Sequence, residues 1–92
     1  MTQLQIREKR RESRRAASGG VRVHFSNPER VEINGRLIDI SPSGFRMAHD
    51  CASLAAGQVV EFTHSEASGR ARVTWNRILE RNVETGFLVL GS

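Results

Sequence analysis

The chain is short and basic, and it contains a single cysteine. It has 92 residues, with 14 Lys and Arg against 10 Asp and Glu, and its one cysteine is Cys51. This length predicts one small domain, and a lone cysteine excludes an internal disulfide or a multi-cysteine metal site. No apolar run is long enough for a membrane span and the first residues lack the apolar part of a signal peptide, so we expect a cytoplasmic protein without membrane contact.

The positive charge is concentrated near the N-terminus. Residues 7–15 read Arg-Glu-Lys-Arg-Arg-Glu-Ser-Arg-Arg, with six basic and two acidic residues. Outside this run, eight basic and eight acidic residues remain, so the rest of the chain is neutral. We expect residues 1–18 to be a flexible basic arm, because the polar run cannot contribute to a core and Gly19-Gly20 frees the backbone. Residues 19–92 are then the folded domain.

Alternation of apolar and polar residues begins after the arm. It predicts six short strands, at about 21–25, 31–40, 45–47, 59–62, 71–75 and 83–89. Asn34-Gly35 predicts a turn or bulge within the second of these, and residues 65–69 a loop. One helical turn is expected within 49–57, with Gly57 as its C-cap. Six strands without a long intervening helix are typical of an antiparallel barrel or sandwich.

No constellation of residues predicts catalysis. A Gly-x-Ser-x-Gly nucleophile motif is absent, and His24, His49 and His64 lack the spacing of metal ligands. We therefore expect no enzyme activity, no metal and no cofactor. Trp75 lies two residues after Val73 and four after Ala71, so on a strand all three side chains point to the same apolar face. This predicts that Trp75 packs in the core. Base stacking by Trp75 is the alternative, and it requires an exposed ring.

The arginine run is compatible with three roles. It is a solvated tail, an arm that neutralises nucleic-acid phosphates, or part of a defined anion pocket. Spacing favours the pocket, because Arg10 and Arg14 lie four residues apart, as do Arg11 and Arg15. Such pairs can converge on one ligand in a helical turn or folded loop.

A second polar stretch is Asp39-Ile40-Ser41-Pro42-Ser43-Gly44. Asp39 and Ser41 share a parity at the end of a strand, so their side chains leave the same face. Gly44 permits a turn and the close approach of a ligand. Alone, the stretch is equally typical of a simple turn between strands.

Together the two stretches resemble the PilZ family. Residues 11–15, Arg-Glu-Ser-Arg-Arg, match its RxxxR motif, and residues 39–44 match its (D/N)xSxxG motif, in the family's order and with a strand between them. Further similarity lies in Phe45 after the motif glycine, in Gly-Arg-Ala-Arg-Val-Thr-Trp at 69–75, and in Thr-Gly-Phe-Leu-Val-Leu at 85–90.

The resemblance implies a fold and a ligand. PilZ domains are six-stranded β-barrels that bind the bacterial second messenger cyclic di-GMP. It implies that Arg11 and Arg15 clamp phosphate and guanine, that Asp39 and Ser41 contact the guanine edge, and that Gly44 turns the backbone beside the base. Ser43 in the same turn is a further candidate.

Two details of the arginine motif remain open. The motif register is alternatively Arg10-x-x-x-Arg14, which adds Arg14 to the site, or Arg7-x-x-x-Arg11. In the family, a basic residue immediately before RxxxR accompanies binding of an intercalated pair of ligands. Arg10 occupies that position, so the resemblance implies two cyclic di-GMP molecules per site.

The expected function is that of a monomeric receptor or adaptor without catalytic activity. Ligand would order the arm over the barrel, and the new arm position would signal to an effector protein. One alternative is a basic β-barrel that binds nucleic acid, but the aromatic residues all fall on strands with a core to fill. Another is a PilZ adaptor that binds no ligand.

Overall fold

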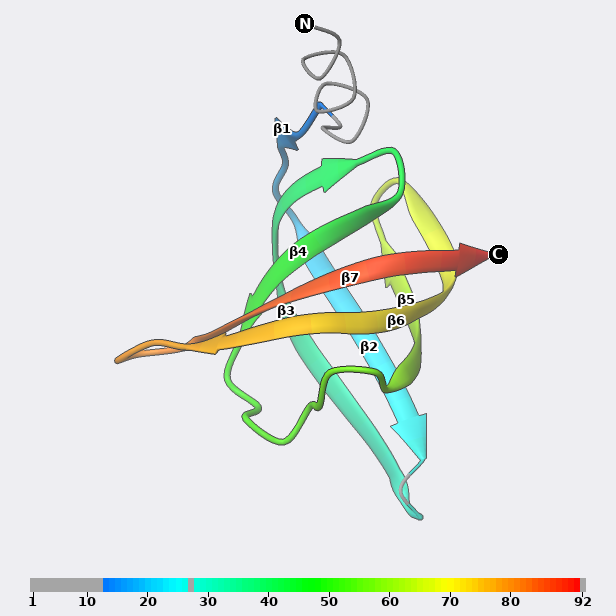
Figure 1. The fold of residues 1–92 in the computed structure, drawn as a ribbon, viewed down its shortest axis with the longest axis vertical. Helices are drawn as coiled ribbons and strands as arrows, with labels where there is room; N and C mark the ends of the chain where they lie inside the picture. Colours follow the sequence, from blue (N-terminus) through cyan, green and yellow to red (C-terminus); the bar gives the residue numbers. More distant parts are fainter. Residues whose placement is uncertain (1–12, 27, 92) are drawn as a thin grey trace, which may run out of the picture.

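The computed structural model describes residues 13–26 and 28–91, which form a closed antiparallel β-barrel (Figure 1). The strands are β1 (Arg15–Ala16), β2 (Gly20–Ser26), β3 (Arg30–Ser41), β4 (Gly44–His49), β5 (Val59–His64), β6 (Ala67–Ile78) and β7 (Val83–Gly91). They pair in the order β1-β3-β2-β5-β6-β7-β4, and β4 pairs back onto β3. Six strands thus close the barrel, and β1 is an extra strand beside β3. The predicted all-β, six-stranded antiparallel barrel is confirmed. Over the described residues, no helix is long and apolar enough to cross a membrane.

The barrel interior is filled by alternate side chains of each strand, as the period of two requires. Phe45 lies at its centre, with ring centroids 4.8 Å from Phe62 and 4.7 Å from Phe87. Other members of the core are Val21, Val23, Ile33, Leu37, Met47, Leu54, Val60, Ala71 and Val73. Closure leaves the six barrel strands with no free edge, so any binding surface lies at an end of the barrel or on its outer wall.

The predicted interruption at Asn34-Gly35 is wrong. β3 runs without a break, and Asn34 and Gly35 pair with Arg22 and Val21 of β2. Glycine is needed for packing, because a Cβ at Gly35 would lie 2.4 Å from the carbonyl oxygen of Ala48. The irregularity of β3 lies instead between Leu37 and Asp39, in the pairing with β4.

Two predicted connections also differ from the structure. Residues 50–58 contain turns and no helix, because Leu54 is drawn into the end of the core and is only 4% exposed. Gly57 still adopts a left-handed backbone, with φ of 94°. The expected loop at 65–69 is a tight turn, since β6 begins at Ala67, which pairs with His64.

The last residues of the predicted arm lie along β3. Arg15 pairs with Ile40 and Ala16 with Asp39. The Ala17 amide then donates to the Ile38 carbonyl at 3.0 Å, and the Leu37 amide donates to the Gly19 carbonyl at 2.9 Å. The hydrogen-bonded sheet therefore extends N-terminally past the predicted boundary at residue 18. Arg10 and Arg11 lie outside the described residues.

Candidate functional site

The short strand β1 brings the end of the arginine run to the turn that follows β3. Its register sets residues 15 and 16 against 40 and 39. The two neighbouring arginines have different partners: Arg14 contacts Asp39 on β3, whereas Arg15 contacts Glu66 in the β5–β6 turn. The run thus ends at the mouth of the barrel, with one guanidinium toward the Asp39 turn and the other toward the β5–β6 hairpin.

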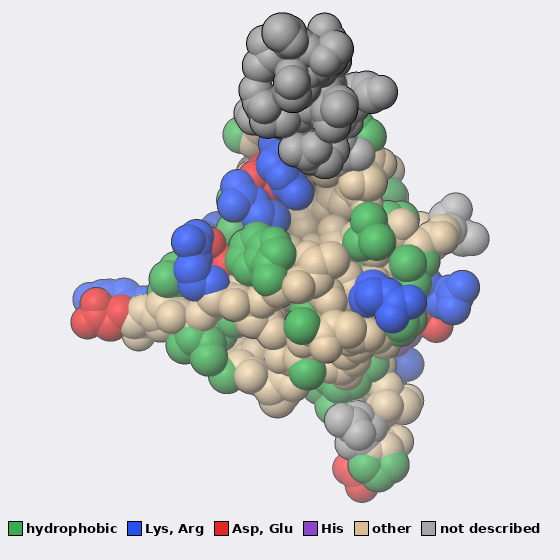
Figure 2. All heavy atoms as spheres, in the orientation of Figure 1, with side chains coloured by type: hydrophobic (Ala, Val, Ile, Leu, Met, Phe, Trp, Pro, Cys, Tyr) green, Lys and Arg blue, Asp and Glu red, His purple; other side chains and the backbone are tan. Residues whose placement is uncertain are grey.

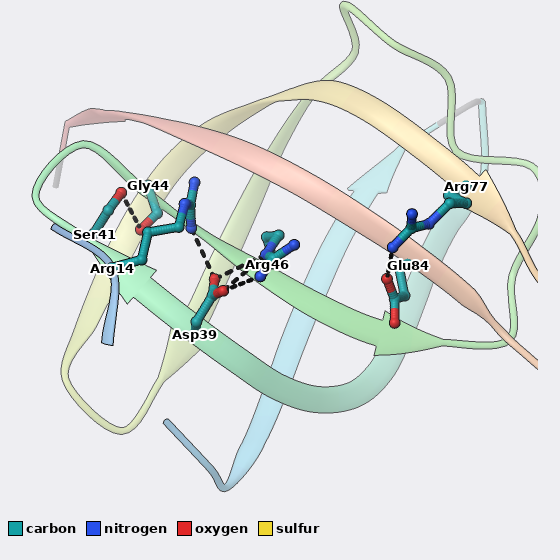
Figure 3. Close-up of polar contacts among 7 residues, drawn as sticks. All are labelled: Arg14, Asp39, Ser41, Gly44, Arg46, Arg77 and Glu84. Atoms are coloured by element: carbon teal, nitrogen blue, oxygen red, sulfur yellow. Dashed lines mark hydrogen bonds and ion pairs between the residues drawn. The ribbon is translucent and has the colours of Figure 1, made fainter. Parts of the chain in front are cut away.

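Asp39 is held by two arginines (Figure 3). Arg14 Nη1 donates to Asp39 Oδ1 at 2.7 Å. Arg46 Nε donates to Oδ1 and Oδ2 at 3.0 and 2.9 Å, and Arg46 Nη2 also bonds to Oδ2. Asp39 is only 6% exposed, whereas the side chains of Arg14 and Arg46 are 43% and 31% exposed. The carboxylate is therefore covered by cations that water still reaches.

These contacts fix the ionisation of Asp39. The pKa of its carboxyl is lowered, chiefly by the hydrogen bond from Arg46 and further by the charges of both arginines, which together outweigh the opposing effect of burial. The same hydrogen bond raises the pKa of Arg46. Asp39 is thus a carboxylate acceptor at neutral pH, as a guanine N–H edge requires.

Arg15 and Glu66 form a forked ion pair across the barrel mouth. Arg15 Nη1 donates to Glu66 Oε2 at 3.2 Å, and Nη2 bonds to Oε1. The hydrogen bond raises the pKa of Arg15 and lowers that of Glu66. Both side chains are exposed, and an exposed pair is readily exchanged because water competes for each partner. Under this pair, the His64 ring stands edge-on to Phe45 with centroids 5.0 Å apart.

The turn from Asp39 to Gly44 is closed by its own hydrogen bonds. Ser41 Oγ donates to the Gly44 carbonyl at 3.4 Å, and the Val89 amide donates to the Ser43 carbonyl at 2.8 Å. The predicted reason for Gly44 is incomplete. Its φ is not positive, but a Cβ there would lie 1.9 Å from the Phe87 carbonyl oxygen. Glycine is required because β7 passes so closely.

Trp75 lies on the outside of the barrel, so the predicted core position is wrong. The register between β6 and β7 shifts between Val73 and Trp75, which turns the Trp75 side chain outward. There the indole covers Gly86, where a Cβ would be 2.3 Å from Trp75 Nε1. Gly86 also pairs with Arg46 of β4. Arg46 and the half-buried indole therefore flank one glycine on the outer wall beside Asp39.

The structure brings together part of the predicted site. Arg14 and Asp39 are in contact, Arg15 adjoins them with its guanidinium on Glu66, and Ser41, Ser43 and Gly44 form the turn. Sequence reasoning missed Arg46 and Glu66. Arg46 could have been predicted from the sequence. A two-residue turn at 42–43 pairs Ser41 with Gly44, and this register sets Asp39 opposite Arg46.

A scan against models of known protein families finds no match for this chain, and a search of curated proteins also finds none.

Proposed function

We propose that this protein is a PilZ-type receptor or adaptor for cyclic di-GMP. The observation that best supports the proposal is the placement of Arg14 and Arg15, the last arginines of the run, beside the Asp39–Gly44 turn, with Arg14 Nη1 2.7 Å from Asp39 Oδ1. Arg15 and Asp39 are 24 residues apart in the sequence, and the pairing of β1 with β3 makes the end of the first motif a neighbour of the second.

The chemistry of these side chains fits a compact guanine nucleotide with two phosphates. Guanidinium groups fork onto phosphate oxygens and onto guanine O6 and N7. A carboxylate such as Asp39 accepts from the guanine N–H edge. The Trp75 indole, on the outer wall beside Arg46, offers a ring face for stacking.

Binding is proposed to proceed by exchange of partners. In the free protein Asp39 holds Arg14, and Glu66 holds Arg15. A guanine edge on Asp39 would displace Arg14, while Arg46, fixed on β4 opposite Asp39, keeps the carboxylate oriented. Arg14 and Arg15 are then available to phosphates, where a charge-assisted hydrogen bond contributes about 1.5–3 kcal/mol.

The same exchange supplies the signal. We expect cyclic di-GMP to order the part of residues 5–18 that precedes β1 over the barrel, at an ordering cost that lowers the affinity. The changed arm position is then read by an effector protein. Heteronuclear NMR relaxation of these residues with and without ligand measures the change, and an arm equally rigid in both states contradicts it.

Titration calorimetry with cyclic di-GMP tests the binding itself. We expect Arg11→Ala or Arg15→Ala to weaken binding by roughly ten- to a hundredfold, and the double variant to show no binding at micromolar ligand. Arg81→Ala, an exposed arginine in the β6–β7 turn, is the matched control and should bind as the wild type. Unchanged affinity in the double variant would overturn the assignment.

The titration also separates the remaining alternatives. Two ligands per chain, reduced to one by Arg10→Ala, support the intercalated pair. A larger loss from Arg14→Ala than from Arg15→Ala supports the Arg10-x-x-x-Arg14 register. Salt-dependent binding to RNA without binding to cyclic di-GMP identifies a nucleic-acid module instead. Binding to neither identifies an adaptor that works by protein contacts alone.

A further inference from the structure

A second surface, distinct from the Asp39 site, carries exposed aliphatic side chains beside arginines. We define the outer β5–β7 face by the outward side chains of Val59, Arg70, Arg72, Leu88 and Leu90. Val59, Leu88 and Leu90 are 40%, 40% and 39% exposed. Val59, Arg72 and Leu88 form one row across the three strands. Figure 2 shows hydrophobic side chains over the C-terminal half of β7, with basic side chains beside them.

Among the described residues, neither arginine of this face is in an ion pair, although Glu61 of β5 is the cross-strand neighbour of Arg70. Most described arginines are in ion pairs, and the described exceptions are Arg36, Arg70, Arg72 and Arg81. Two of these four thus stand on the same side of β6. Arg72 Nη1 donates only to the Gly57 carbonyl, at 3.4 Å, and Arg70 is exposed. Two exposed guanidinium groups that form no ion pair with a described residue are therefore in place to bind carboxylates.

A hollow continues the face around the barrel. It has a volume of about 820 Å³, and both Val59 and Arg70 line it. Its other side carries His24 and Arg30 from the β2–β3 hairpin. Glu61 is the acid within it, and its carboxylate is 3.6 Å from His24 Nε2. The hollow thus adds basic groups and depth beside the aliphatic row.

We infer that the outer β5–β7 face docks an acidic segment of a partner protein that also carries aliphatic side chains. Aliphatic groups on the partner would cover Val59, Leu88 and Leu90, and carboxylates would pair with the forked guanidinium groups of Arg70 and Arg72. An apolar centre with charged groups around it is the usual anatomy of a protein interface. Complementary charge then fixes the register and speeds association.

The charge distribution disfavours other occupants. A second copy of this chain fits poorly. The described acids without an arginine partner are Glu29, Asp50, Glu61 and Glu80: three of them lie in separate turns, and Glu61 lies beside Arg70 on this face. RNA fits poorly as well, because single-stranded nucleic acid is held by aromatic platforms and the five side chains of this face are aliphatic or arginine.

The face adjoins the Asp39 site. Leu88 of β7 pairs with Gly44 of β4, the last residue of the turn that begins at Asp39. A partner on the face is therefore close to the ligand end of the barrel. Its role as the output of a cyclic di-GMP receptor rests on the proposed function, whereas the docking itself does not.

An NMR titration without cyclic di-GMP tests the docking. The probes are two synthetic peptides of equal length, one alternating Glu with Leu and the other alternating Lys with Leu. We expect only the Glu peptide to bind, with amide shifts centred on β5, β6 and β7. Comparable binding of the Lys peptide, or no binding of the Glu peptide, overturns the proposal. Tighter Arg70-dependent binding to single-stranded RNA or to phosphatidylglycerol vesicles also overturns it.

Matched variants locate the effect. Arg70→Gln and Leu88→Ser should each weaken binding of the Glu peptide by about tenfold. Arg81→Gln removes the same charge from the distant β6–β7 turn and should bind as the wild type. All three should keep wild-type spectra elsewhere and wild-type affinity for cyclic di-GMP. If the Glu peptide does not bind while cyclic di-GMP does, only the docking proposal is contradicted. If the Glu peptide binds and cyclic di-GMP does not, only the proposed receptor function is contradicted.

Discussion

The two ends of the barrel are held by opposite kinds of polar contact. At the mouth, Asp39 is bound by Arg14 and Arg46, whose guanidinium groups remain partly exposed. At the other end lies a neutral chain of hydrogen bonds that begins at a buried contact. His49 Nε2 lies 2.7 Å from Thr85 Oγ1, and both side chains are buried. Thr85 then donates to Asn76 Oδ1 at 2.7 Å, and the half-buried Asn76 donates through Nδ2 to the Leu54 carbonyl at 2.7 Å. The first end is charged with partly exposed cations, and the second is neutral with a fully buried His49–Thr85 contact.

The direction of every hydrogen bond in the buried chain is determined. The Cys51 amide donates to His49 Nδ1 at 3.1 Å, so Nδ1 carries no proton. Nε2 therefore holds the proton and donates to Thr85, whose hydroxyl is left to donate to Asn76. The chain connects β4, β7 and β6 to Leu54, which closes this end of the core.

The difference shows which end can change partners. Exposed ion pairs contribute little, because water replaces either partner. A buried hydrogen bond that loses a partner costs the full desolvation of the remaining group, about 1–3 kcal/mol. The mouth is thus suited to exchange its arginines for a ligand, whereas the closed end keeps the barrel shape fixed during that exchange.

Thr85→Val should have the largest effect. Valine matches the shape of threonine but leaves His49 Nε2–H and Asn76 Oδ1 without a partner at a position that is 0% exposed. We expect the free energy of unfolding to fall by roughly 2–4 kcal/mol, since the buried His49 Nε2–H and the half-buried Asn76 Oδ1 are both orphaned. Urea denaturation measures it.

The control is Thr63→Val on the exposed face of β5, which should change stability by at most about 0.5 kcal/mol. Cyclic di-GMP affinity per folded molecule should be unchanged in both variants. An equal, small effect of the two substitutions would mean that the buried chain does not fix the closed end.

The barrel class and most strand positions could be predicted because alternation is a local signal. The chemistry at both ends depends on register between distant residues. Trp75 faces outward only because pairing slips next to Val73. His49 and Thr85 are 36 residues apart, and no local pattern joins them. The sequence placed Gly44 correctly in the turn after β3. The group that makes glycine necessary there is the Phe87 carbonyl, which lies far along the chain on β7.

Asp39→Asn should have an intermediate effect on stability. It removes the charge that Arg14 and Arg46 share but keeps an oxygen acceptor, and water reaches both guanidinium groups. We expect a loss of about 1–2 kcal/mol in the free energy of unfolding. Cyclic di-GMP binding should fall by at least about tenfold, because the amide repels one guanine donor. A stability loss as large as that of Thr85→Val would contradict the contrast between the two ends.

Acidification should affect the two histidines and Asp39 in separate pH ranges, with His49 at the closed end and His64 at the mouth. Burial lowers the pKa of His49 and of His64 in the folded protein. As the pH falls below about 6.5, the ordinary pKa of histidine, these side chains therefore take up protons in the unfolded chain before they do so in the folded one. Stability is complete above that pH and declines below it. The pKa of Asp39 is also lowered, so its contribution is lost only at pH below about 4.

Urea midpoints measured between about pH 7.5 and about pH 5.5 report the histidine range. We expect His49→Gln to flatten this decline, and the slope to fall further when His64→Phe is added. Asp39→Asn should leave the slope in this range unchanged. If His49→Gln keeps the full wild-type slope, the buried chain is not what acid disrupts.

Glu66→Gln should have the smallest effect on stability and the most selective effect on binding. Glu66 and Arg15 are exposed, and within the described residues the ion pair of each is with the other, so we expect an unchanged urea midpoint. Removing the carboxylate frees Arg15 for ligand phosphate without an exchange, and cyclic di-GMP affinity should therefore rise by a few-fold. Glu84→Gln, which releases Arg77 on the outer wall instead, is the matched control and should leave affinity unchanged. An equal gain in both variants would mean that affinity follows the net charge and not the position of Arg15.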